Sequence, residues 1–159
     1  MTCIILASAS PRRKQLLAEA GYEFTVQPTD IDESAFPIDG VSPCEYARQL
    51  ALAKAKSISD KFPDSIVIGA DTVVDFNGQI IGKPDDEKEA EQIVRKLFSG
   101  PHKVITAVAV VRLNDSTEIV ENDATIVYPK KLSDEQIAGH IKGRTWRGKA
   151  GAYAIQETG

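Results

Sequence analysis

The chain has 159 residues, of which 42% are hydrophobic and 26% charged, a composition typical of an ordinary soluble globular protein. Its net charge of −4 argues against a protein that coats nucleic acid, so any anion site must be local. Two cysteines, Cys3 and Cys44, and two histidines exclude the usual zinc-binding spacings. The sequence has neither a secretory leader nor an apolar run of membrane-spanning length. These features predict one reduced, cytoplasmic domain that binds neither nucleic acid nor a membrane.

The first candidate site lies between a predicted strand, residues 3–7, and a helix predicted to continue to Ala20. The connecting sequence is Ser-Ala-Ser-Pro-Arg-Arg, residues 8–13, in which Ser10 can cap the helix and Pro11 suits its first position. Two arginines in a first helical turn are disfavoured by the helix dipole by ~0.3–1 kcal/mol each. The pattern therefore predicts an anion site at this turn, although a solvated basic turn remains the alternative.

A second group of charged residues lies in the next segment. A short strand is predicted at 22–26, followed by an acidic loop at 29–40 that contains Glu33. The sequence Ser-Pro-Cys-Glu, residues 42–45, predicts a capping box at the start of a helix that continues to about residue 60. Lys54 falls in the middle of the apolar stripe of this helix. It should therefore face inward, where it would extend its ammonium toward solvent, pair with a carboxylate or meet a substrate anion.

A third group surrounds a buried strand predicted at 65–70. The strand is expected to break at Asp71 and Thr72, where a carboxylate could act as a base or hold a metal. An Asn-Gly hairpin at 77–78 should return the chain through 79–81 and bring Lys83 close to Asp71. A surface ion pair is the alternative for these two residues.

The remaining sequence predicts the frame of the fold. Expected elements are a helix from residue 85 or 86 to about 100, strands at 102–113 and 117–128, a helix at 133–142 and extended chain from 151. Residues 143–150 match most of the P-loop pattern, but Ala150 replaces the hydroxyl that would bind magnesium and no helix follows. We therefore reject a P-loop, while Lys149, between glycines, could still approach a phosphate.

The candidate residues consist of cations and carboxylates without a histidine base or a nucleophile elbow, which disfavours covalent acyl chemistry. The cations are Arg12, Arg13, Lys54, Lys83 and Lys149, and the carboxylates are Glu33 and Asp71, with Asp32 nearby. Such a set suits a polyphosphate substrate with a divalent metal, because cations hold phosphate oxygens and carboxylates hold the metal or activate water. Hydrolysis of a phosphoanhydride is the reaction this chemistry favours.

These motifs, in this order across the whole chain, resemble the Maf family of nucleoside triphosphate pyrophosphatases. The resemblance rests on the turn at 8–13, Glu33, Lys54, the run Gly-Ala-Asp-Thr-Val-Val at 69–74, Gly-Lys-Pro at 82–84 and Gly-Lys-Ala-Gly-Ala-Tyr-Ala-Ile-Gln at 148–156. It implies a single α/β domain, residues 1–159, with an elongated, strongly twisted mixed sheet flanked by helices, as in the inosine triphosphate pyrophosphatases. It also implies hydrolysis of a nucleoside triphosphate to monophosphate and pyrophosphate with magnesium or manganese, in a cytoplasmic and often dimeric protein.

The resemblance also implies individual roles. Asp71 matches the proton acceptor that activates water, and Glu33 matches an acidic residue that holds metal, a role that Asp71 would share. Phosphate binding falls to Arg13, Lys54 and Lys83, with Ser8 in the phosphate turn. Positions that mark the branch preferring dTTP and UTP are Arg12, Thr72 and Gln156. The side-chain amide of Gln156 could read the O4 and N3–H edge of uracil or thymine.

Three alternatives accompany this interpretation. A sister branch that prefers 7-methyl-GTP resembles the same motifs but differs in the run at 150–156. A non-catalytic regulator of septum formation could use the same pocket to sense nucleotide, and an inosine-type triphosphatase is disfavoured by the turn at 8–13. Family members continue past residue 159 through a Gly-rich turn into another strand and helix, so this chain is expected to be short at its C-terminal end, where Glu157 stands in place of a common glycine.

Overall fold

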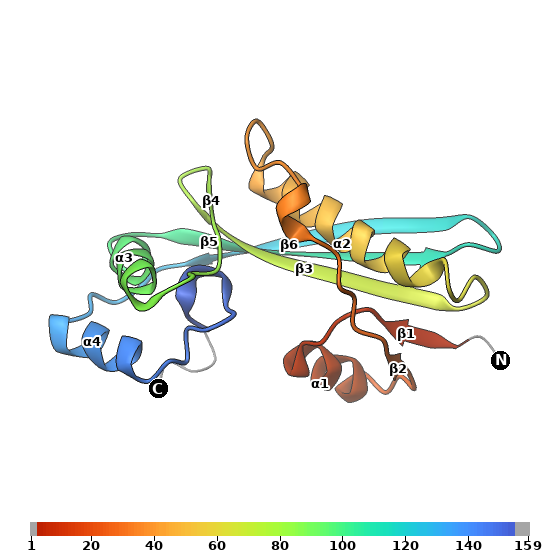
Figure 1. The fold of residues 1–159 in the computed structure, drawn as a ribbon, viewed down its shortest axis with the longest axis horizontal. Coiled ribbons are helices and arrows are strands. Elements are labelled where there is room, and N and C mark those ends of the chain that lie inside the picture. The colour runs from red at the N-terminus through yellow and green to blue at the C-terminus, as the bar shows by residue number, and fades with distance from the viewer. Residues whose placement is uncertain (1–2, 155–159) are drawn as a thin grey trace. The chain divides into compact units, whose positions relative to one another are not determined.

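The computed structural model describes residues 3–154 and shows a mixed sheet with helices beside it (Figure 1). The strands are β1 (Ile4–Leu6), β2 (Thr25–Val26), β3 (Ile66–Phe76), β4 (Gln79–Ile81), β5 (His102–Arg112) and β6 (Thr117–Val127). The α-helices are α1 (Pro11–Glu19), α2 (Pro43–Ser59), α3 (Glu87–Leu97) and α4 (Asp134–Lys142), and there are 3-10 turns η1 (Glu33–Ala35) and η2 (Ala150–Ala152).

The sheet has the strand order β2-β1-β3-β5-β6, and the sixth strand, β4, also pairs with β3. β1 is parallel to both β2 and β3, whereas β4 is antiparallel to β3. This mixture confirms the predicted α/β class with a mixed sheet. The hairpin between β3 and β4 turns at Asn77 and Gly78, both with positive φ, as a two-residue turn of the predicted kind requires.

The chain divides into two compact units, which are described separately. Unit 1 comprises residues 1–71 and 106–123, and unit 2 comprises residues 72–105 and 124–159. The prediction of one domain over residues 1–159 stays a prediction.

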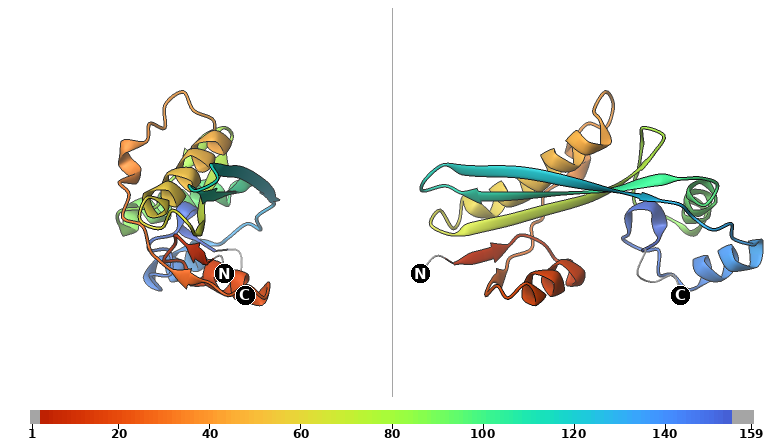
Figure 2. Two further views of the ribbon diagram at one scale, coloured as in Figure 1. Left: turned by 90° about the vertical axis from the view of Figure 1, so that its right-hand side faces the viewer. Right: turned by 180° about the vertical axis from the view of Figure 1, so that it is seen from behind.

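In unit 1, the long helix α2 packs along β3, as the views of Figure 2 also show. Ser42 caps the helix by accepting a hydrogen bond from the Glu45 N–H, which is the half of the predicted capping box that Ser42 supplies. The buried face of α2 includes Leu50, 1% exposed, which together with Val67 on β3 is among the largest fully buried side chains. Burying such a side chain contributes roughly 1.5–3 kcal/mol, so the buried face of α2 contributes to the core of unit 1.

In unit 2, helices α3 and α4 share a small apolar core that contains Val94, Ile137 and Trp146. Helix α4 begins with the predicted capping box, formed reciprocally by Ser133 and Gln136. Across the described residues 3–154, no helix is both long enough and apolar enough to span a membrane.

Several sequence predictions need correction. β2 covers only Thr25–Val26 of the predicted 22–26, and the acidic loop contains the turn η1, because Asp32 caps it by accepting from the Ser34 N–H. The chain does not become extended directly at Gly151, since η2 covers Ala150–Ala152.

Candidate active site

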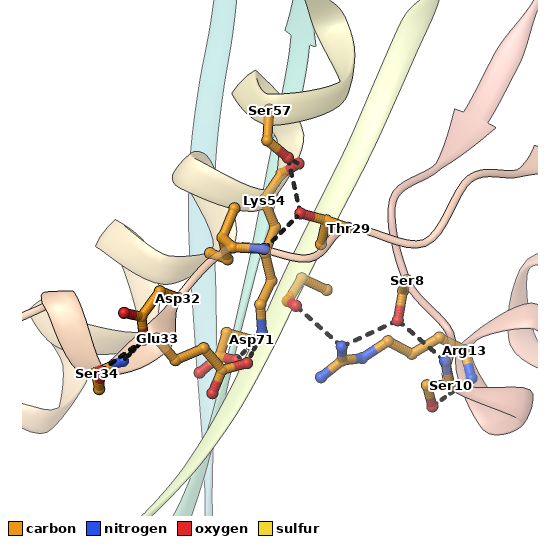
Figure 3. Close-up of polar contacts among 12 residues, drawn as sticks. Ser8, Ser10, Arg13, Thr29, Asp32, Glu33, Ser34, Lys54, Ser57 and Asp71 are labelled. Carbon is orange, nitrogen blue, oxygen red and sulfur yellow. Dashed lines mark hydrogen bonds and ion pairs between the residues drawn. The ribbon is translucent and has the colours of Figure 1, made fainter.

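The candidate site in unit 1 is centred on Lys54, which lies on the buried face of α2 (Figure 3). Its ammonium Nζ lies 2.6 Å from Asp71 Oδ1 and 2.9 Å from Glu33 Oε1. Lys54 is 9% exposed and Asp71 6% exposed, so this contact is a buried ion pair. The prediction that Lys54 faces inward and pairs with a carboxylate is therefore confirmed, and two carboxylates share it.

Asp71 lies in the middle of β3, not at a break in the strand as the sequence predicted. The strand remains continuous because the Asp71 side chain points toward α2 and accepts a hydrogen bond from Lys54 instead of interrupting the ladder. Burial raises the pKa of Asp71 above its ordinary value, while the hydrogen bond and charge of Lys54 oppose that increase. The result is a carboxylate that is more basic than an exposed aspartate.

Glu33 reaches Lys54 from the short turn η1, which the sequence analysis treated only as a loop. Asp32 starts this turn and also accepts a hydrogen bond from the Ser34 hydroxyl at 2.6 Å. Because these contacts occupy Asp32 with its own turn, Glu33 is the acidic residue of the loop that faces Lys54.

The predicted turn between β1 and α1 forms with Ser10 as the helix cap, whose hydroxyl accepts from the Arg13 N–H. The Arg13 side chain reaches β3, and its Nη1 donates to the Ala70 carbonyl at 2.9 Å and to the Ser8 hydroxyl at 3.3 Å. Burial lowers the pKa of Arg13, and the charges of Asp71 and Glu33 oppose that decrease. Arg13 thus lies within electrostatic reach of both carboxylates.

The two flanking positions of the turn differ. Arg12 is exposed and donates to Gln15 on the same helix, at 3.3 Å. Ser8, 7% exposed, accepts from the Ser10 N–H at 3.2 Å in addition to Arg13. Ser8 and Arg13 are therefore fixed parts of the site's structure, whereas Arg12 lies at the surface.

The remaining predicted residues lie in unit 2 or outside the described chain. Thr72 follows Asp71 on β3, Lys83 follows β4, and Lys149 precedes η2. A backbone hydrogen bond of 3.1 Å from the Gly151 N–H to the Gly82 carbonyl joins the loops that carry the two lysines. The expected approach of Lys83 to Asp71 stays a prediction, and Gln156 lies outside the described residues.

Two features of the site escaped the sequence analysis. Tyr46 on α2 is buried, and burial followed by the charges of Asp71 and Glu33 raises the pKa of its hydroxyl, so Tyr46 lies within electrostatic reach of the acidic pair. The spacing 46, 50, 54 on one helix could have indicated this. Gly69 is the second feature: a Cβ there would lie 2.3 Å from the Ala51 carbonyl oxygen, so only glycine allows α2 to lie this close beside Lys54.

Glu33 and Asp71 are the side chains of the site that could hold a divalent cation. Glu33 and Asp71 already converge on one positive group, the Lys54 ammonium, from separate elements. Among residues 3–154, no group of three acidic, histidine or cysteine side chains forms a metal site made of protein ligands alone. Magnesium commonly uses one or two carboxylates and takes its other ligands from substrate phosphates and water, so the residues present fit that ion.

Comparison with known proteins agrees with the motifs. The family model described as Maf-like protein matches residues 3–159. The chain belongs to this family. A protein of Ruminiclostridium cellulolyticum named dTTP/UTP pyrophosphatase is 38% identical to this Maf-like chain over 159 residues, covering 100% of the chain and 82% of that protein. A protein of the same name from Alkaliphilus oremlandii is 46% identical over 157 residues, covering 98% of the chain and 80% of that protein.

Solved structures show the same fold at low identity. The Ham1 protein of Staphylococcus aureus aligns with a TM-score of 0.54 at 14% identity, covering 84% of the Maf-like chain and 88% of that protein. A HAM1 protein from Coxiella burnetii aligns with a TM-score of 0.52 at 16% identity, covering 80% of the Maf-like chain and 73% of that protein. The predicted family and its fold are therefore confirmed.

Proposed function

We propose that this Maf-like protein hydrolyses dTTP and UTP between the α and β phosphates, releasing the nucleoside monophosphate and pyrophosphate. The observation that carries the proposal is the buried Lys54, shared by Glu33 and Asp71 beside the arginine of the helix-start turn. A buried carboxylate with a raised pKa beside convergent cations is the arrangement expected of a hydrolase for a polyphosphate. The names of the relatives, dTTP/UTP pyrophosphatase at 38% and 46% identity, support the choice of substrate.

Asp71 is the proposed general base. Lys54 contacts its Oδ1, so Oδ2 is the oxygen that would take a proton from the attacking water. Its raised pKa makes the carboxylate a better proton acceptor, and Lys54 keeps it ionised at neutral pH. As the water oxygen bonds to the α-phosphorus, the bond to the bridging oxygen breaks and pyrophosphate leaves.

The proposed role of the cations is to bind the phosphate oxygens and to offset the charge that develops as the bond breaks. The Nη1 of Arg13 donates to Ala70 and Ser8, which fixes the guanidinium charge at the position where it would attract a phosphate. Lys54 would supply the positive charge nearest to Asp71, the proposed general base. Further contacts with the phosphates and the rest of the substrate are proposed for Ser8, Arg12, Thr72, Lys83 and Lys149. Gln156 is proposed to contact the nucleobase. Removing one such donor typically lowers the rate by about 10²–10³.

Glu33 and Asp71 are the residues that would hold magnesium or manganese. The metal would neutralise phosphate charge when bound. The proposed setting is the cytoplasm, and the proposed partner is the nucleotide itself, with a second copy of the chain as a homodimer.

A nucleotide panel with identification of the products tests this function. The protein is incubated with dTTP, UTP, 7-methyl-GTP and inosine triphosphate in magnesium, and pyrophosphate is separated from inorganic phosphate by ion exchange. The proposal predicts monophosphate and pyrophosphate from dTTP and UTP. Turnover confined to 7-methyl-GTP would indicate the sister branch, and binding of dTTP without any product would indicate a regulator.

A further inference from the structure

The two histidines of the sequence bond to neighbouring residues of one turn in unit 2. From α4, the His140 Nε2–H donates to the Ala152 carbonyl at 2.8 Å. From the start of β5, His102 Nε2 is hydrogen-bonded to the Tyr153 hydroxyl, and this histidine is only 3% exposed. Two elements that are distant in sequence therefore hold the same short segment.

That segment has an unfavourable backbone. Gly148 and Gly151 have φ values of 71° and 72°, and Ala152, which carries a Cβ, has φ of 60°. The left-handed conformation costs a residue with a Cβ roughly 1–2 kcal/mol. Gly151 also has no room for a side chain, because a Cβ would lie 2.9 Å from both Leu97 Cδ1 and Val74 Cγ2. The turn is consequently maintained by its contacts with the rest of unit 2.

The backbone of the turn is also connected to the segments that carry two lysines. Lys149 is the residue immediately before η2. The Gly151 N–H donates to the Gly82 carbonyl at 3.1 Å, which ties the turn to the residue before Lys83. A shift of the Ala152–Tyr153 backbone would therefore displace Lys149 directly and the Lys83 loop through this bond.

We propose that His140 and the His102–Tyr153 pair are positioning residues that hold Lys149 and Lys83 for the triphosphate. This inference rests on the proposed function, because it requires the lysines to bind substrate phosphates. The histidines and Tyr153 act through the turn and not on the reacting atoms.

Both histidines can form these hydrogen bonds with a neutral ring. His102 Nδ1 lies 3.4 Å from the Gly100 carbonyl, which favours the tautomer with a proton on Nδ1 and leaves Nε2 to accept from the Tyr153 hydroxyl. Burial raises the pKa of Tyr153 to about 12, so its hydroxyl keeps that proton at neutral pH. His140 can donate from Nε2 both as the neutral Nε2–H tautomer and as the cation.

The test is a double-mutant cycle on binding of a non-hydrolysable nucleotide, α,β-methylene dTTP with magnesium, measured by calorimetry on the full chain. Tyr153→Phe removes only the hydroxyl, and His140→Leu removes the donor. His140→Gln restores a side-chain N–H and should rescue binding. Each change is made in the parent and in Lys149→Ala, and each variant is first shown to be folded by its melting curve. Tyr128→Phe, which removes a hydroxyl from a tyrosine that is 76% exposed, is the matched control.

Tyr153→Phe and His140→Leu should each raise the Kd about tenfold in the parent, the effect of about 1.4 kcal/mol for one hydrogen bond that fixes the turn. In Lys149→Ala the same changes should raise the Kd by a smaller factor than in the parent, because only their effect through Lys83 remains. Equal effects in both backgrounds, an unchanged Kd in a folded variant or a parent that does not bind the analogue would overturn the inference. If the cycle behaves as expected while the parent releases no pyrophosphate from dTTP, only the proposed catalytic function fails.

Discussion

Replacing Gly69 by alanine should separate Lys54 from Asp71 without altering either residue. Gly69 lies on β3 two residues before Asp71, against the α2 backbone on either side of Lys54. A Cβ at this position would lie 2.3 Å from the Ala51 carbonyl oxygen and 2.6 Å from the Ala55 nitrogen. Both atoms belong to helix backbone, so the contact cannot be relieved by a rotamer change.

The displacement follows from these distances. A carbon and a carbonyl oxygen approach to about 3.3 Å at closest, so α2 must move away from β3 by about 1 Å. The contact between Lys54 Nζ and Asp71 Oδ1 is now 2.6 Å, and the same shift would lengthen it to about 3.6 Å, beyond a hydrogen bond. Misplacement of this size typically costs about 10² in rate, and overpacking of a core costs about 1–3 kcal/mol in stability.

The assay combines kcat/KM for dTTP, the melting temperature and the pH dependence of kcat/KM. Gly69→Ala should lower kcat/KM about 100-fold and the melting temperature by at least about 2 °C. The acid limb of the variant's pH profile of kcat/KM should move to higher pH, because Lys54 no longer favours the ionised form of Asp71. A variant that is merely less stable would keep the parent's pH profile below its melting temperature.

Gly139→Ala is the matched control, since a Cβ at Gly139 in α4 meets nothing within 4 Å and alanine favours a helix interior by ~0.5–1 kcal/mol. It should retain full activity with equal or higher stability. Parental kcat/KM, pH profile and melting temperature in Gly69→Ala would refute the idea that this glycine sets the distance between α2 and Asp71.

Three further outcomes are expected. In the parent, the acid limb of the pH profile of kcat/KM should lie above the ordinary pKa of aspartate, because the base must be ionised and burial raises the pKa of Asp71. Lys54→Met should move that limb to still higher pH. A limb that moves to lower pH would contradict the pairing of Lys54 with Asp71. Pyrophosphate release should stop in excess chelator and return when magnesium is added, whereas undiminished release would exclude the proposed metal. Ser133→Ala should destabilise the protein by about 0.5–2 kcal/mol through loss of the α4 cap while leaving the KM for dTTP unchanged, as thermal denaturation and steady-state kinetics would show.

Much of the fold was predictable because local signals agreed with tertiary packing. Ser10, Ser42 and Ser133 each cap the helix that the sequence assigned to them. The hairpin at Asn77–Gly78 was equally clear, since two consecutive positive φ angles restrict the residues that can occupy the turn. The inward position of Lys54 followed from helical periodicity, which decides the face of a side chain independently of its partner.

The rest depended on contacts that are distant in sequence or, at Glu33, on a local hydrogen bond that the composition of the loop did not indicate. A strand break at Asp71 was expected because a charged residue interrupts an apolar run, but the ion pair with Lys54, 17 residues away, lets the carboxylate stay within the ladder. The turn that carries Glu33 depends on a local bond between Asp32 and Ser34, which the acidic composition of the loop concealed. The close approach at Gly69 could not be derived from one sequence, because a glycine within a strand pattern does not reveal which backbone lies over it.

The central claim is that Asp71 activates water while the cations bind the nucleotide. Single-turnover release of pyrophosphate from dTTP with magnesium, beside dTTP binding by calorimetry, tests it in Asp71→Asn. The control is Asp75→Asn on the same strand, where an amide oxygen can still accept from the Gly78 N–H. The account predicts at least about a 100-fold slower release in Asp71→Asn with binding retained within a few fold, and parental rates in the control. Release by Asp71→Asn at nearly the parental rate would contradict the account.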